Sequence, residues 1–181
     1  MNNPQTDNSY FEAKKKLRLD HLPEKDPITV LDCYSGAGRI WNEIAKSTKK
    51  KIRILPIDKE KKRKDSFLQG DNLKFLASID LSIFDIVDLD AYGVPFRQLD
   101  MVLSRAVSGQ IIFITFIQSM FGIIPLQMLK KIGYPESMVK KCPSLFSKNG
   151  FEKFKQFLCL YGIRKITHFS PGRKHYIFIS K

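Results

Sequence analysis

The sequence lacks the features that mark a secreted, disulfide-linked or membrane-spanning protein. Its three cysteines, Cys33, Cys142 and Cys159, are odd in number and widely spaced, so neither a disulfide framework nor a C-x-x-C pair is present. No apolar run reaches the roughly 18 residues that a membrane-spanning helix requires. Residues 1–7 have neither the basic nor the apolar region of a signal peptide. We therefore expect a soluble, cytoplasmic protein with no membrane segment.

A metal site is not expected either. Cys142, Cys159, His168 and His175 contain the right atoms for zinc, but their spacing matches no usual zinc pattern. Cys159 also falls within an amphipathic helical pattern. The prediction is therefore that the protein uses no metal.

Acidic residues are scarce compared with basic ones. The chain has 18 Asp and Glu against 31 Lys and Arg, a formal net charge of +13. This surplus predicts a polyanionic partner, nucleic acid, rather than a membrane surface, because no basic helix has a strongly apolar face. A lysine-rich composition spread over solvated faces is the alternative explanation. The cations gather in short runs: Lys14–Lys16, Lys49–Lys51, Lys59–Lys64, Lys130–Lys131, Lys140–Lys141 and Arg173–Lys174.

The length and the apolar content suit one domain. With 181 residues and 43% hydrophobic residues, the chain is able to bury a substantial core. Residues 1–9 are expected to be disordered, and residues 10–181 to form a single domain. No internal repeat and no long Ser/Gly linker interrupts that range.

Strand-like and helix-like patterns alternate along the chain. Five β–α units are followed by two strands joined by a Pro171-Gly172 turn. This succession predicts an α/β fold: a doubly wound, mainly parallel, Rossmann-like sheet with helices on both faces and a C-terminal antiparallel hairpin. Strands are expected within 28–32, 51–57, 66–69, 84–90, 111–117, 163–169 and 175–180. Helical segments are expected at 10–19, 39–46, 95–106, 123–131 and 151–161, with a loop or short helices at 135–149.

The most informative segment follows the first expected strand. Asp32 ends an apolar run, and a turn containing Gly36 and Gly38 leads into a helical pattern from Arg39. Glycines let the backbone approach a ligand where a Cβ would clash, and the N–H groups of a helix start hold anionic groups. The segment predicts a cofactor loop, although a plain strand–helix corner has the same pattern.

Two cofactor classes compete for this loop. A dinucleotide fingerprint needs a third glycine where Trp41 stands, and an indole hinders close packing around a pyrophosphate. S-adenosylmethionine has no pyrophosphate and carries a sulfonium and an amino-acid head, which suit a glycine turn beside a carboxylate. S-adenosylmethionine is therefore the predicted cofactor. The contacts expected from this loop are Asp32, Tyr34, Ser35, Gly36 and Gly38.

Polar residues also follow the second and third expected strands. Asp58 closes the second strand, where an acidic residue is placed to bind the two ribose hydroxyls. Asp71 and Asn72 follow the third and are able to bind an adenine amine. A helix N-cap at Asp58 and a turn at Asp71 are the simpler alternatives. Because the strand ends occur in order, we predict all three residues as cofactor contacts.

Two aspartates lie at the end of the fourth expected strand. Asp88 and Asp90 are two residues apart and therefore face the same side of a strand. Burial and like charge would raise the pKa of at least one of them, so the pair suits a site that binds a cation or an amine. The alternative is that the strand has already ended and both side chains are solvated.

Several segments resemble the tRNA guanine-N2 methyltransferases, which modify the junction below the D arm. The similar segments run from Leu31 to Ala45, from Gln69 to Asn72, from Ser108 to Gly122 and, most specifically, from Phe84 to Asp100 (FDIVDLDAYGVPFRQLD). They share an Asp-x-Tyr-Gly-x-Pro element and cover about half the chain. The resemblance implies the class I S-adenosylmethionine-dependent methyltransferase fold and a base amine of RNA as substrate.

The chain also departs from that family. Ala91 stands where the family has proline, Val94 where it has a small hydroxyl residue, and Phe116 lies where it has a polar Thr-Asp pair. The family's second, RNA-handling domain is not expected within 181 residues. A reduced relative, or one that acts on another nucleic acid, is therefore expected.

The expected catalytic residues come from the Asp-x-Tyr-Gly-x-Pro element. Asp90 is expected to accept a hydrogen bond from the substrate amine and to stabilise the positive charge that grows there. Tyr92 is expected to stack on the base, with simple core packing as the alternative. Asp88 is the alternate for the role of Asp90.

The favoured function is methyl transfer from S-adenosylmethionine to an exocyclic base amine of RNA, with tRNA guanine preferred. A catalytically silent nucleic-acid-binding protein and a DNA base-amine methyltransferase are the alternatives, and a small-molecule methyltransferase ranks third. The expected partners are nucleic acid and either a partner subunit or a second copy of the chain.

Overall fold

A computed structural model describes residues 10–59, 68–118, 124–147 and 149–181. The predictions for residues 1–9 and for strand residues 66–67 lie outside this part of the chain, as do five of the six positions of the basic run 59–64. The strands are β1 (Ile28–Asp32), β2 (Ile52–Asp58), β3 (Leu68–Gln69), β4 (Ile86–Leu89), β5 (Ile111–Ile117), β6 (Thr167–Phe169) and β7 (Lys174–Ser180). The helices are α1 (Phe11–Leu19), α2 (Arg39–Ser47), α3 (Asn72–Ser78), α4 (Phe96–Arg105), α5 (Leu126–Lys131), α6 (Glu136–Lys141), α7 (Pro143–Ser147) and α8 (Gly150–Cys159), with a 3-10 turn, η1, at Leu81–Ile83.

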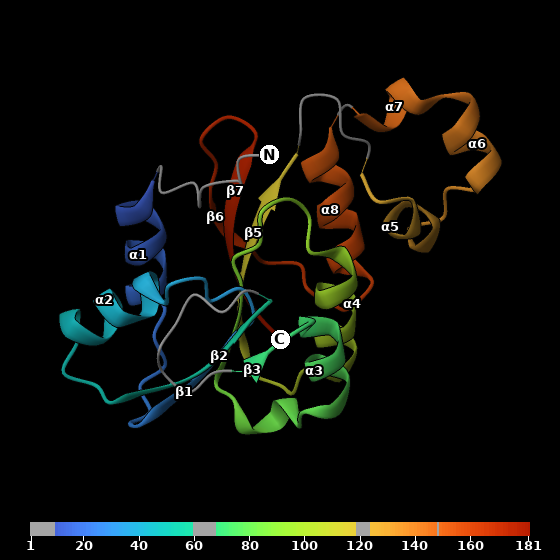
Figure 1. The fold of residues 1–181 in the computed structure, drawn as a ribbon. Helices are drawn as coiled ribbons and strands as arrows, with labels where there is room; N and C mark the ends of the chain where they lie inside the picture. The colour runs from blue at the N-terminus through green and yellow to red at the C-terminus, as the bar shows by residue number, and fades with distance from the viewer. Residues whose placement is uncertain (1–9, 60–67, 119–123, 148) are drawn as a thin grey trace.

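The described strands form one seven-stranded sheet in the order β3-β2-β1-β4-β5-β7-β6 (Figure 1). Strands β1 to β5 run parallel, whereas β7 runs antiparallel to both β5 and β6. The strand order reverses between β1 and β4, and ligands of open α/β sheets bind beyond the carboxyl ends of the strands at such a switch point. The predicted doubly wound sheet with a C-terminal antiparallel hairpin is confirmed.

Helices cover both faces of the sheet (Figure 1). Helices α1 and α2 lie on one face, over a core cluster that includes Trp41 and Phe113. Helices α3, α4 and α8 lie on the other face, over a larger cluster. The predicted apolar stripe of α8 is confirmed, because Phe154 and Leu158 are fully buried in that larger cluster.

Strand β4 shows how the two faces arise from the sequence. All four of its residues are buried, as expected for a strand covered on both sides. Val87 and Leu89 belong to the α3–α4–α8 cluster, whereas Ile86 belongs to the α1–α2 cluster. Asp88 follows Ile86 by two positions and therefore faces α1 and α2. A carboxylate thus stands inside an apolar layer, and it requires partners there.

Some element boundaries differ from the sequence-based expectation. Helix α5 begins at Leu126, after Pro125, because a proline disfavours the helical conformation at the residue before it, here Ile124. Strand β6 begins at Thr167 rather than at residue 163. Ile163 instead donates its N–H to Leu158 O and closes the end of α8. The region 135–149 contains the two short helices α6 and α7, as expected.

Candidate functional site

The turn after β1 is tied to the end of β2. Gly36 and Gly38 adopt positive φ angles of 50° and 69°, which L side chains rarely adopt. Gly36 N–H donates to Asp58 Oδ2 at 2.7 Å, and Ser35 N–H donates to Ile57 O at 3.1 Å. Hydrogen bonds therefore link the glycine turn to the acidic end of β2.

Asp32 is a buried carboxylate that lacks a full set of partners. Only 2% of the residue is exposed, and its sole hydrogen bond within the described chain is a long one of 3.4 Å from Tyr34 N–H to Oδ1. Oδ2 has no partner there. Burial, reinforced by the nearby Asp88 and Asp90 carboxylates, raises the pKa of Asp32 well above its ordinary value. An Asp32 carboxylate of this kind is stabilised by a cation placed against Oδ2.

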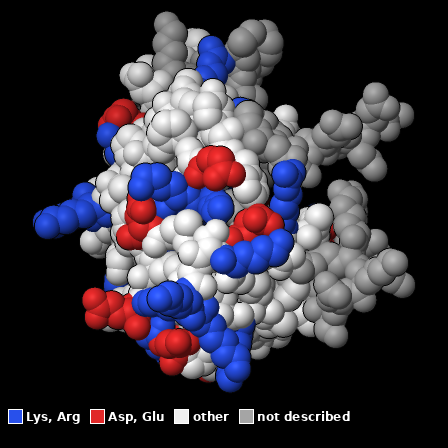
Figure 2. Space-filling model, turned by 90° about the vertical axis from the view of Figure 1, so that its left-hand side faces the viewer, with Lys and Arg blue, Asp and Glu red and all other residues white. Residues whose placement is uncertain are grey.

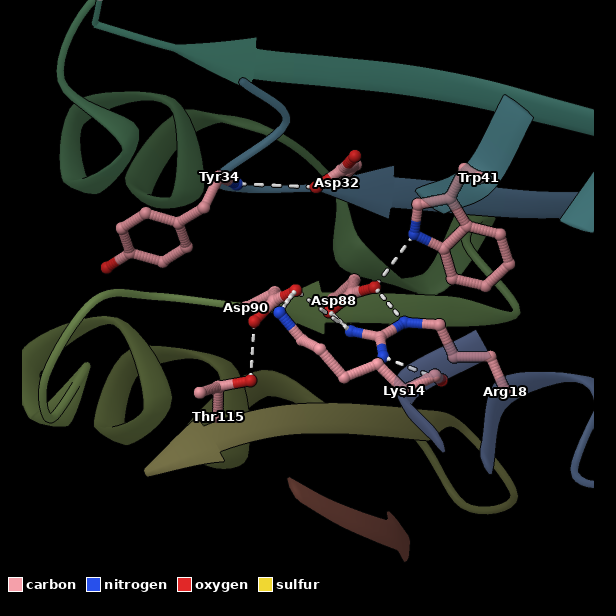
Figure 3. Close-up of polar contacts among 8 residues, drawn as sticks. All are labelled: Lys14, Arg18, Asp32, Tyr34, Trp41, Asp88, Asp90 and Thr115. Carbon is pink, nitrogen blue, oxygen red and sulfur yellow. Dashed lines mark hydrogen bonds and ion pairs between the residues drawn. The ribbon is translucent and has the colours of Figure 1, made fainter. Parts of the chain in front are cut away.

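Asp88 is fully buried and is held by a bidentate arginine. Arg18 of α1 donates from Nε to Oδ2 at 2.7 Å and from Nη2 to Oδ1 at 2.8 Å (Figure 3). Trp41 of α2 donates from Nε1 to Oδ2 at 2.8 Å. Both oxygens are therefore engaged by protein groups, and Asp88 has a structural role because it anchors α1 and α2 to the sheet.

Asp90 lies just beyond β4, and its carboxylate contacts the amine of Lys14. Lys14 Nζ lies 2.6 Å from Oδ2, Arg18 Nη2 lies 3.6 Å from the same oxygen, and Thr115 Oγ1 donates to Oδ1 at 2.5 Å (Figure 3). Burial opposes ionisation, but the Arg18 and Lys14 cations outweigh it and lower the pKa of Asp90. Asp90 is thus an ionised acceptor that already binds an ammonium group.

The expectation that Asp88 and Asp90 face the same side is confirmed, since Arg18 contacts both. The alternative that both are solvated is wrong, because Asp88 is fully buried and the Asp90 side chain is only 16% exposed. Sequence reasoning missed Lys14 and Arg18 as members of the site. Their only signal was a spacing of four residues within a basic helix, which places both on one helix face.

The polar pair after β3 has structural contacts of its own. Asp71 Oδ1 accepts from Leu73 N–H at 3.0 Å and caps α3. Asn72 is buried; its Nδ2 donates to Cys33 O at 3.0 Å, and its Oδ1 accepts from Gln98 at 2.9 Å. The amide of Asn72 therefore links the β1 loop, α3 and α4.

Tyr34 lies close to this pair, and Tyr92 lies apart from the core. Burial raises the pKa of Tyr34 to about 12, against a smaller opposing effect of the nearby Asn72 side chain. Tyr92 is 76% exposed, so the alternative that it packs in the core is wrong. The loop that carries Tyr92 is held to β5, because Ile117 N–H donates to Gly93 O at 2.9 Å.

The residues weighed as zinc ligands have other surroundings. His168 and His175 both hydrogen-bond to Ser170 Oγ at 2.8 Å, whereas Cys142 and Cys159 are exposed free thiols. Among the residues that the structure describes, no group of three or more His, Cys, Asp or Glu is placed to hold a metal. No helix in the same residues has the length and apolarity that crossing a membrane demands.

Positive and negative side chains are interspersed on the α1–α2 side of the molecule (Figure 2). Lys16 pairs with Asp20 at 2.9 Å, and Lys46 pairs with Glu43 at 2.8 Å. The surplus of positive charge therefore does not form an unbroken patch on this face.

Neither a protein-family model nor a curated protein sequence matches the chain. Solved structures do match. Trm1 from Pyrococcus horikoshii in complex with S-adenosyl-L-methionine has a TM-score of 0.59 and 16% identity, over 99% of this chain and 56% of that one. A SAM-dependent methyltransferase from Archaeoglobus fulgidus has a TM-score of 0.57 and 16% identity, over 94% of both chains.

A third similar structure is a putative rRNA-methylase from Clostridium thermocellum. Its TM-score is 0.56 and its identity 13%, over 97% of both chains. At these identities the likeness concerns the fold. The chain has the class I methyltransferase fold, as the resemblance implied, and its acidic strand ends lie at the carboxyl edge of the parallel strands.

Proposed function

We propose that this chain is an S-adenosylmethionine-dependent methyltransferase that acts on an exocyclic base amine of RNA, with tRNA guanine preferred. The observation that carries the proposal is the geometry of Asp90, a carboxylate at the carboxyl end of β4 whose Oδ2 lies 2.6 Å from the Lys14 amine. A carboxylate that accepts from the Lys14 amine is chemically able to accept from a base amine in its place. The fold, shared with methyltransferase structures, supports the choice of reaction.

The residues around Asp32 fit the cationic part of S-adenosylmethionine. Asp32 Oδ2 is buried without a partner in the described chain, and burial raises the pKa of its carboxyl group. A positively charged ligand group placed there would both fill the missing contact and favour the ionised carboxylate. Asp32 is therefore assigned to the amino-acid head or the sulfonium, with the turn of Tyr34, Ser35, Gly36 and Gly38 beside it.

The adenosine end is assigned to the ends of β2 and β3. Asp58 is assigned to the ribose hydroxyls, because it closes β2 and is oriented by the Gly36 N–H. Asp71 is assigned to the adenine amine. Asn72 takes part indirectly, since its amide already serves Cys33 O and Gln98 and positions the loop through them.

When bound, S-adenosylmethionine supplies an electrophilic methyl group. The chain supplies the acceptor for the nucleophile: Asp90 Oδ2 accepts a hydrogen bond from the base amine and stabilises its growing positive charge. Because the pKa of Asp90 is lowered, the carboxylate remains ionised at neutral pH and keeps this role. The Lys14 ammonium must leave Oδ2 when the base amine arrives. Lys14 is therefore an internal competitor of the substrate.

Tyr92 supports a base as the substrate. Its ring is exposed, in the loop that directly follows Asp90, and aromatic rings at such positions stack on unpaired bases. Asp88 is not proposed as the acceptor, because Arg18 and Trp41 engage both of its oxygens.

The test is transfer of radiolabelled methyl from S-adenosylmethionine to total tRNA, with other RNA and with DNA in parallel. Asp90→Asn is expected to retain cofactor affinity and to slow transfer by roughly a hundredfold, the scale of a positioned acid–base group. Asp20→Asn, an exposed change on the end of α1, is the matched control and should leave the rate unchanged. Equal rates for wild type and Asp90→Asn would contradict the assignment.

A second candidate is a nucleic-acid-binding protein that keeps the fold without catalysis. The ion pair between Lys14 and Asp90 favours it, since the proposed acceptor is occupied in this structure. Cofactor binding and nucleic-acid binding without methyl transfer to any RNA or DNA would support this candidate over the enzyme.

A further inference from the structure

A groove lies between α3, α4 and α5, on the face of the sheet away from α1. Its volume is about 640 Å³. The apolar part of its lining comes from Leu73, Phe96 and Met101. Basic side chains from α4 and α5 and the carboxylate of Asp100 also line it. The groove therefore combines contact area for flat or apolar groups with positive charge.

Two of its cations come from α5 and have carboxylate partners. Lys131 Nζ lies 2.5 Å from Asp100 Oδ1, and Lys130 Nζ lies 3.4 Å from Glu136 Oε2. The Lys130 side chain is 45% exposed, and its contact is long for a charge-assisted hydrogen bond. Lys131 is thus compensated, whereas Lys130 is able to exchange Glu136 for an external anion.

The other two cations come from α4 and form no ion pair with any described residue. Arg105 donates from Nη2 to Ile79 O at 2.6 Å and from Nη1 to Leu76 O. It forms no ion pair in the described chain, although its charge contributes, after the Ser82 hydrogen bonds, to the lowered pKa of the Asp80 carboxyl group. Arg97 is exposed and makes neither a hydrogen bond nor an ion pair in the described part of the chain. Eight residues of helix separate the two, about 12 Å along α4.

The groove includes the start of α4, which follows the Asp90–Tyr92 loop along the chain. Helix α4 starts at Phe96, directly after the loop of Asp90 and Tyr92, and Arg97 is its second residue. An RNA strand with one base stacked on Tyr92 would continue past Arg97 along α4. Arg97 and Arg105 are far enough apart along α4 to contact different phosphates of one nucleic-acid strand.

We infer that the α3–α4–α5 groove binds the phosphate backbone of the RNA that presents its base to Asp90. The inference rests on the proposed function for the identity of the nucleic acid. It assigns the binding surface to Arg97, Arg105 and Lys130, and not to the α1–α2 side, where acidic residues are interspersed with the basic ones. Arg97, which forms no ion pair in the described chain, and Lys130, whose contact with Glu136 is long, supply most of the electrostatic complementarity.

The test is binding of labelled tRNA, measured by fluorescence anisotropy at several salt concentrations and without S-adenosylmethionine. Arg97→Ala/Lys130→Ala removes two groove cations. Arg53→Ala/Lys46→Ala removes the same charge from exposed positions on β2 and α2 and is the matched control. Thermal unfolding of each variant confirms folding. We expect the groove variant to bind several-fold more weakly and to lose about two from the slope of log affinity against log salt.

If the two double variants weaken tRNA binding equally, the assignment of the groove is overturned, because the affinity would then depend on net charge alone. A wild-type affinity that does not depend on salt would also overturn it and would indicate a small-molecule ligand. Because binding is measured without cofactor, the proposed reaction is judged separately. If only the groove variant lowers the slope of log affinity against log salt, and no methyl transfer is detected, the result supports RNA binding in the groove and contradicts the proposed reaction.

Discussion

The Arg18→Met variant tests how this fold keeps carboxylates inside the apolar layer under α1. Methionine preserves an unbranched side chain but removes both hydrogen bonds to Asp88, at 2.7 and 2.8 Å. Asp88 is fully buried, so the loss leaves a buried carboxylate with only the Trp41 donor. Breaking a buried ion pair in this way costs about 3–5 kcal/mol in the free energy of unfolding.

A double variant separates the ion pair from general packing. Arg18→Met/Asp88→Leu replaces both charges with apolar groups next to Ile86 and Phe113, and such replacements are often neutral. Trp41 Nε1 loses its acceptor, which costs about 1–3 kcal/mol. The double variant should therefore be more stable than Arg18→Met and somewhat less stable than wild type.

Urea unfolding at pH 7 measures these differences, and the fluorescence of Trp41, the single tryptophan of the chain, reports on this contact directly. An Arg18→Met variant whose free energy of unfolding lies within about 1 kcal/mol of wild type would refute the reasoning, because a buried Asp88 carboxylate without its cation should cost more than that. A double variant no more stable than the single one would refute it as well.

Three further predictions concern the cofactor and the amine. Asp32→Asn should stabilise the protein in the absence of ligand. The pKa of Asp32 is raised in the folded state, so the wild-type protein loses stability as pH rises above the ordinary pKa of about 3.9. In urea unfolding, the stability advantage of the variant should therefore grow with pH. Asp58→Ala should weaken S-adenosylmethionine binding by about 1–3 kcal/mol in calorimetry, whereas Asp20→Ala should not. Lys14→Met should lower the KM for the nucleic acid and leave cofactor affinity unchanged, and an unaltered KM would show that Lys14 does not compete for Asp90.

The sheet and its acidic edge were predictable because local patterns determine them. Apolar runs ending in Asp32, Asp58 and Asp90 mark buried parallel strands, and the carboxyl ends of such strands meet at one edge of the sheet. The two-residue spacing of Asp88 and Asp90 fixed their shared face. These inferences needed only the period of a strand and the order of the units.

The partners of the carboxylates were not predictable, because they come from distant parts of the chain. Arg18 and Asp88 are 70 residues apart, and nothing in a basic helix indicates which cation is buried. In the sequence, Trp41 was informative only because it stands where a dinucleotide fingerprint needs a glycine. The structure shows that its Nε1 donates to Asp88. The contact of Lys14 with Asp90 depends on how α1 packs on the sheet, which tertiary structure decides.

Calorimetric titration of the wild-type chain with S-adenosylmethionine tests the central claim most directly. In the proposed function a ligand cation lies against Asp32 Oδ2, which has no partner in the described chain, so we expect saturable binding of one cofactor per chain and a rise in thermal stability. The absence of both heat and a thermal shift at millimolar cofactor would contradict the claim.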